Sequence, residues 1–117
     1  GNDMSRKVFE IRTEPHEAVI GDVTLLFMSE TSGAAFATAY SSLKEAQRLI
    51  TDAGENAGAA ELTAVSNGMR AFVESFLLTE SLDAFDALKL PDRILVQLLE
   101  FVAELYSGKA GTSSSAS

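Results

Sequence analysis

The sequence contains no cysteine and no tryptophan, and among its 117 residues there is one histidine. Without cysteine the chain can form no disulfide, no thiolate nucleophile and no cysteine-ligated metal site. His16 has no second histidine at metal-binding spacing, and we interpret it as an ordinary surface residue. The acidic pair Glu100 and Glu104 lacks the histidine motif of a carboxylate di-metal site. The sequence therefore predicts no catalytic residue, no metal ligand and no cofactor.

Long apolar runs are also absent. The longest, residues 23–28 and 94–99, are interrupted by Thr24 and Gln97. Neither approaches the roughly 20 residues that a membrane-spanning helix needs. No basic start followed by an apolar run and a cleavage site marks a secretory signal. We therefore expect no membrane partner and a cytoplasmic location.

Positive charge is scarce, since the chain has nine Lys and Arg residues and seventeen Asp and Glu residues, which gives a net charge of −8. Such a chain repels phosphate backbones and anionic lipids, so we expect no nucleic-acid partner. The charge is explained by solubility alone, or else it steers a basic partner. With 46% apolar and 22% charged residues, the composition is that of a globular domain.

The chain divides into three parts. Residues 1–3 precede the first methionine, and we interpret them as a cloning remnant. Residues 4–108 are predicted to form a single globular domain, with a β-element over 4–30 and helices over 31–108. Residues 109–117 are mostly small and polar, cannot bury much apolar area, and are predicted to be a disordered tail.

The β-element is expected to contain two or three short strands. The first candidate strand lies within residues 7–12, before the breaker pair Glu14-Pro15. Two further strands flank the turn signal Gly21-Asp22. A lone hairpin is marginal in water, so it must pack on helices or pair with another chain. The apolar residues of the first strand are Val8, Phe9 and Ile11, and those expected to mediate self-association are Val23, Leu25 and Phe27.

From Ser32 onward, apolar residues recur every three or four positions, which predicts helices. Thr31 or Ser32 is a candidate N-cap of the first helix, and Gly54 suits its C-terminal end. A second helix is predicted from about residue 59 to 78, with Gly68 at either a weak point or a close helix contact. Ser81 is a possible cap of a third helix. The fold class is therefore mainly α, with a short N-terminal β-hairpin or small β-element followed by a bundle of about four helices.

The last helix is predicted to begin at Pro91 and to carry an apolar face wider than a small domain needs. An excess of exposed apolar surface is typical of a protein-binding site. The candidate partner-binding residues are Ile94, Leu98, Phe101 and Leu105.

The segment LPDRILVQLLEFVAELYSGK, residues 90–109, closely resembles the end of the shorter tail assembly chaperone of long-tailed phages that infect actinobacteria. The segments VFEI at residues 8–11 and VTLLF at Val23–Phe27 are also similar to that family. The resemblance covers most of residues 4–110. It is specific in the last helix and looser in the middle, and only Gly108 and Gly111 remain of the family's glycine-rich end.

The resemblance implies a protein without catalytic residues that binds the tape measure protein, keeps it soluble and promotes tail tube assembly. It further implies a longer form, made by programmed ribosomal frameshifting, that recruits the tail tube protein. The expected setting is the cytoplasm of the host bacterium, as a homo-oligomer that is absent from the mature virion. The residues alone leave a second interpretation open, a generic self-associating helical adaptor or regulatory protein.

Overall fold

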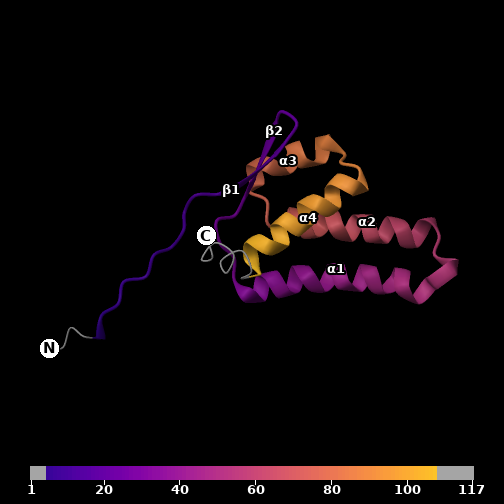
Figure 1. Cartoon of the computed structure of the whole chain (residues 1–117), viewed down its shortest axis with the longest axis horizontal. Coiled ribbons are helices and arrows are strands. Elements are labelled where there is room, and N and C mark those ends of the chain that lie inside the picture. The colour runs from indigo at the N-terminus through magenta and orange to yellow at the C-terminus, as the bar shows by residue number, and fades with distance from the viewer. Residues whose placement is uncertain (1–4, 108–117) are drawn as a thin grey trace.

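The computed structural model describes residues 5–107. Its elements are β1 (His16–Ile20), β2 (Val23–Phe27), α1 (Gly33–Ala53), the short 3-10 turn η2 (Gly54–Asn56), α2 (Ala59–Glu74), α3 (Thr79–Leu88) and α4 (Asp92–Tyr106). The predicted fold class, mainly α with an N-terminal hairpin and four helices, is confirmed. In Figure 1, α1 and α2 run side by side, α4 crosses α2 and ends near α1, and the hairpin lies beside α3. The predicted N-terminal remnant (residues 1–3) and C-terminal tail (residues 109–117) lie outside the described residues.

The hairpin forms at the predicted turn. Its strands are antiparallel, and Ile20 pairs with Val23 across the two-residue turn Gly21-Asp22. Gly21 has a φ of +63°, the left-handed value that a tight hairpin turn requires at its first central position. Side chains alternate between the two faces of the sheet, and β2 turns Leu25 and Phe27 into the core.

The third strand that the sequence suggested is absent, so the prediction of a strand within residues 7–12 is wrong. Residues 5–13 instead form an extended arm that leaves the body of the molecule (Figure 1). The chain enters β1 through Glu14-Pro15, with a bend at Glu14, and the arm does not turn back to pair with β1. The backbone N–H of Arg12 donates to Oε2 of Glu30 at 2.9 Å and holds the root of the arm.

The predicted ends of α1 are confirmed. Oγ of Ser32 accepts a hydrogen bond from the backbone N–H of Ala35 at 3.0 Å, and Gly54 ends the helix with a φ of +57°. The predicted close contact at Gly68 is also confirmed. A Cβ added to Gly68 would lie 2.9 Å from Cβ of Ala46, so α1 and α2 approach each other closely here.

The second helix is shorter than predicted, because α2 ends at Glu74 and not at residue 78. The backbone of residues 76–78 leaves the helix to bond the outer edge of β2. The N–H of Met28 donates to the carbonyl of Phe76, and the N–H of Leu78 donates to the carbonyl of Leu26, both at 2.9 Å. These two bonds could not form if the segment stayed helical.

Ser81 does not cap α3, which corrects the prediction for this residue. The helix begins two residues earlier, at Thr79, with Leu78 as its N-cap residue. Ser81 is buried, and its Oγ accepts the backbone N–H of Leu26 at 3.0 Å. The hydroxyl thus satisfies the outward N–H of Leu26 on β2.

The core lies between the hairpin and all four helices. Phe27, Phe72, Phe76 and Phe85 are its largest fully buried side chains. Around them pack the buried apolar residues Leu25, Leu43, Met69, Val73, Leu77, Leu95, Leu98 and Val102. Because β2 and α4 both contribute to this core, the hairpin is fixed relative to the last helix.

Candidate protein-binding grooves beside α4

Helix α4 contributes to the core along one stripe and leaves a groove on each side. Leu95, Leu98 and Val102 are buried in the core. On one side the helix faces β1, and we call the space between them the strand-side groove. On the other side it faces α1, and we call that space the helix-side groove.

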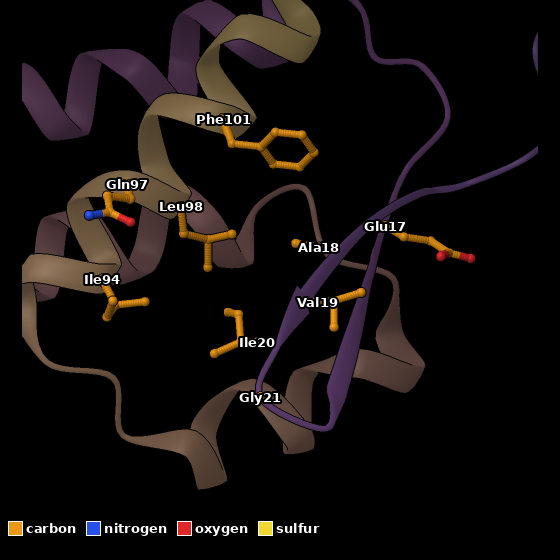
Figure 2. A pocket seen from close by; sticks show the side chains of 9 residues that line it. All are labelled: Glu17, Ala18, Val19, Ile20, Gly21, Ile94, Gln97, Leu98 and Phe101. Carbon is orange, nitrogen blue, oxygen red and sulfur yellow. The ribbon is translucent and has the colours of Figure 1, made fainter.

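The strand-side groove has a volume of about 460 Å³. Its lining residues are Glu17, Ala18, Val19, Ile20 and Gly21 from the hairpin and Ile94, Gln97, Leu98 and Phe101 from α4. In Figure 2, the apolar side chains of α4 and of β1 stand on opposite sides of the open space. Glu17, the charged lining residue, points away from α4 in that view. The groove is therefore walled by apolar side chains on both sides.

One wall of this groove is an open strand edge. Glu17 pairs with Leu26 in the register, and the N–H and C=O of Leu26 bond outward to Ser81 and Leu78. In an antiparallel ladder both members of such a pair point away from each other, so the N–H and C=O of Glu17 and Val19 lie on the outer edge of β1. Within residues 5–107 no hydrogen bond to that edge is present. The Val19 side chain is 67% exposed.

The structure brings three of the four predicted partner-binding residues together. Ile94, Leu98 and Phe101 line the strand-side groove, whereas Leu105 lies one turn further along α4 and does not. Phe101 is partly exposed and packs edge-on against the ring of Phe27, with centroids 6.3 Å apart. Leu98 is 5% exposed, so it lies at the floor of the groove and offers little area to a partner.

The predicted self-association residues lie elsewhere than expected. Leu25 and Phe27 are 0% exposed, and Val23 packs against the same core. The apolar face of β2 is turned inward onto the chain's own helices, and a role of these three side chains in self-association stays a prediction. Sequence reasoning missed β1 as the accessible strand. The period of two along β1 was the available signal, because it places the apolar Val19 on the same outer face as the charged Glu17.

The helix-side groove is larger, at about 720 Å³. Its lining residues are Phe36, Tyr40, Leu43 and Gln47 from α1 and Leu99, Glu100, Ala103, Glu104 and Ser107 from the end of the chain's last helix. The Phe36 and Tyr40 rings stack with centroids 5.9 Å apart and an interplanar angle of 10°. Glu100 and Glu104 are exposed at the rim. The groove thus combines an aromatic and aliphatic floor with an acidic rim.

His16 is half-buried, which corrects its interpretation as an ordinary surface residue. Its Nε2 donates to the carbonyl of Ser29 at 3.1 Å, and its ring packs edge-on against Tyr106 with centroids 6.0 Å apart. The Tyr106 hydroxyl donates to the carbonyl of Met28, and burial raises the pKa of Tyr106 to about 12. His16 and Tyr106 therefore join the hairpin to the end of α4.

In the part of the chain that the structure describes, no three His, Asp or Glu side chains gather so that they could hold a metal ion. The same part contains no helix of the length and apolarity required to cross a membrane. No protein-family model, curated protein or solved structure matches this chain.

Proposed function

We propose that this chain is a protein-binding chaperone that acts without catalysis. In particular, we propose that it is the short form of a phage tail assembly chaperone, which binds the tape measure protein, keeps it soluble and promotes assembly of the tail tube. The resemblance of residues 90–109 to that family supports the proposal, and so does the helix-side groove.

The helix-side groove is the observation that carries the proposal. An amphipathic helix binds by laying its apolar face into a groove between helices. The floor formed by Tyr40, Leu99 and Ala103 is of that kind, and the lining continues along α1 from Phe36 to Gln47, a length of about 17 Å. The tape measure protein is expected to be long and helical, so it offers many such faces.

The charge of the body favours a client helix with basic flanks. Residues 14–107 contain fifteen acidic and five basic side chains and carry a net charge of −10. At the groove this charge is represented by Glu100 and Glu104. Complementary charges raise the rate of encounter, and several copies along one client add avidity.

The remaining partners and the setting belong to the same proposal. A frameshifted long form would bring the tail tube protein to the bound tape measure protein. The complex would form in the cytoplasm of the host bacterium, and the chaperone would leave as tube subunits replace it. The chain would then be absent from the mature virion.

Co-expression with a tape measure fragment tests the proposal. The wild-type chain should raise the soluble fraction of the fragment, and the double substitution Glu100→Lys and Glu104→Lys should abolish most of that gain. Both side chains are exposed, so thermal stability should change little. The matched control is Glu55→Lys with Asp83→Lys, which changes the net charge equally at exposed positions outside the groove.

Two results would contradict the proposal. If the wild-type chain leaves the soluble fraction of the client unchanged, the chain is not its chaperone, and a self-associating adaptor becomes the better explanation. If the control variant loses activity as fully as the groove variant, net charge and not the helix-side groove drives binding.

A further inference from the structure

We propose that the arm of one copy, residues 5–13, adds as a third strand to the open edge of β1 in a second copy of this chain. Phe9 and Ile11 of the incoming arm would occupy the strand-side groove. The inference concerns self-association and does not depend on the client of the proposed function. It assigns an occupant to the groove whose wall is a strand edge, since such an edge binds extended segments by backbone hydrogen bonds.

The arm has the properties of a donor strand. Val8, Phe9 and Ile11 are between 70% and 78% exposed, although each is a large apolar residue typical of strands. Side chains two residues apart share a face of an extended chain, and Nζ of Lys7 lies 5.3 Å from the centre of the Phe9 ring. Ile11 falls on that same face. The arm therefore presents an apolar pair in the spacing that fits one side of a sheet.

The edge of β1 has the properties of an acceptor. Natural proteins protect exposed strand edges with lysine, proline or bulges, or cover them. Within His16–Ile20 there is no lysine and no proline, and the register with β2 contains no bulge. The opposite edge of the hairpin is covered at Leu26 and Met28 by residues 76–78 and Ser81. An added strand would extend the sheet over Ile94 and Phe101 of α4.

Charge supports the same pairing. Arg6, Lys7 and Arg12 outweigh Glu10 and give residues 5–13 a net charge of +2. The body, residues 14–107, carries −10, and Glu17 lies on the acceptor strand. The basic arm is therefore attracted to the acidic body of another copy, with a strength that falls as salt is added.

The geometry favours a second copy over the chain's own arm. Reaching the edge of its own β1 would require the chain to reverse between Arg12 and His16. The bond from the Arg12 N–H to Glu30 opposes that reversal, because it holds the root of the arm at Glu30 and directs the arm outward. A separate client peptide could use the same edge, and the experiments below distinguish this case.

Analytical ultracentrifugation of the full chain provides the first test. The wild type should self-associate, and the substitution Val19→Pro should weaken that association by about tenfold or more, because it removes an outward N–H and obstructs the incoming strand. Thr24→Pro is the matched control. Thr24 pairs with Val19 in the register, so its N–H points to the opposite edge of the hairpin. Circular dichroism should confirm that both variants fold.

A monomeric wild type at all concentrations would overturn the inference, because it would leave the edge to a client. Equal association of the folded Val19→Pro and Thr24→Pro variants would overturn it as well. If Val19→Pro fails to fold, Phe9→Asp with Ile11→Asp replaces it, since these exposed side chains make no contribution to the core. That variant should likewise dissociate.

The absence of cysteine allows a direct second test. One chain would carry Val19→Cys and a second chain of different mass would carry Val8→Cys, Phe9→Cys or Ile11→Cys. After mixing and oxidation, at least one arm position should form a disulfide of summed mass, since neighbouring strands lie within disulfide range. Thr24→Cys should not do so. A single chain that carries Val19→Cys together with one of the arm cysteines tests the alternative. If it forms only an intramolecular disulfide, the arm folds back on its own β1 and the inference fails.

Discussion

The backbone N–H of Leu26 donates to Oγ of Ser81, 55 residues further along the chain, at 3.0 Å. A strand edge is thus completed by a hydroxyl inside a helix. The neighbouring bonds from Met28 to Phe76 and from Leu78 to Leu26 continue the same contact. Together they fix the hairpin against the α2–α3 connection and leave β1 as the outer strand.

Replacing Ser81 by alanine should lower the free energy of unfolding by about 1–2 kcal/mol, because the N–H of Leu26 then loses its partner in a partly buried site. Alanine is also the better helix former, which offsets part of the loss. Ser41→Ala, at an exposed position of α1, measures that offset. Urea unfolding of the three proteins is the measurement. Equal stability of the two variants would show that the bond contributes nothing.

Replacing Gly68 by alanine should destabilise the protein by about 1–3 kcal/mol, despite the higher helix propensity of alanine. The added Cβ would lie 2.9 Å from Cβ of Ala46, so α1 and α2 must move apart. Ala46→Gly in the same chain should restore part of the loss, and a double-mutant cycle measures this coupling. Gly33→Ala is the control, because nothing lies within 4 Å of its added Cβ. Additive effects of the two substitutions would contradict the close contact.

Stability should fall between about pH 10 and pH 12 because of Tyr106. Burial raises the pKa of its hydroxyl from 10.0 to about 12, so in this range the unfolded chain loses the proton that the folded chain keeps. Proton release then favours unfolding, whereas below pH 10 this group contributes no pH dependence. Denaturant unfolding at both ends of the range is the measurement. Tyr106→Phe should reduce the decline and Tyr40→Phe should retain it, and the reverse order would refute the assignment.

The gene is expected to carry a −1 slip site over the codons for Ser107-Gly108-Lys109. Helix α4 ends at Tyr106, whose contacts with Phe76 and Met28 hold the end of the helix on the body. An extension added after this point would leave the described fold intact. Codons TCG GGA AAG would supply the heptamer G GGA AAG, and reading the nucleotides is the test. Absence of any slippery heptamer between the codons for Tyr106 and Ser117 would remove this support for the chaperone proposal.

The ends and contacts of the helices were predictable from the sequence where the chemistry of a single residue determines them. Ser32 and Gly54 mark the ends of α1 by their own chemistry, and Gly68 indicated the close approach of α1 and α2. The end of α2 was not predictable in this way. Phe76 and Leu78 continue the helical spacing, and only the hydrogen bonds offered by β2, more than 45 residues earlier, draw them out of the helix.

The candidate site was predictable only in part, for a similar reason. The apolar stripe of Ile94, Leu98 and Phe101 is visible in the sequence, but the strand edge opposite it depends on which way the hairpin faces. Val8, Phe9 and Ile11 have the composition of a strand without the partner that would make them one. Sequence composition reports the tendency of a segment, whereas the bond from Arg12 to Glu30 determines what that segment can reach.

The coverage of β2 by residues 76–78 and Ser81 also limits the number of other copies that one chain can bind through its hairpin and arm. Each chain then has two association sites of different kinds: the arm, which supplies a strand, and the uncovered edge of β1, which accepts one. Two copies that exchange arms fill both sites and close a twofold dimer. In the other arrangement, each copy gives its arm to the next copy in a head-to-tail row. One edge and one arm stay unused at the two ends, and the row grows until the rotation between neighbouring copies closes it into a ring. The path of the chain at Pro15 and the hydrogen bond from the Arg12 N–H to Glu30 determine the direction of the arm. They thereby determine whether the chain forms a twofold dimer or a ring.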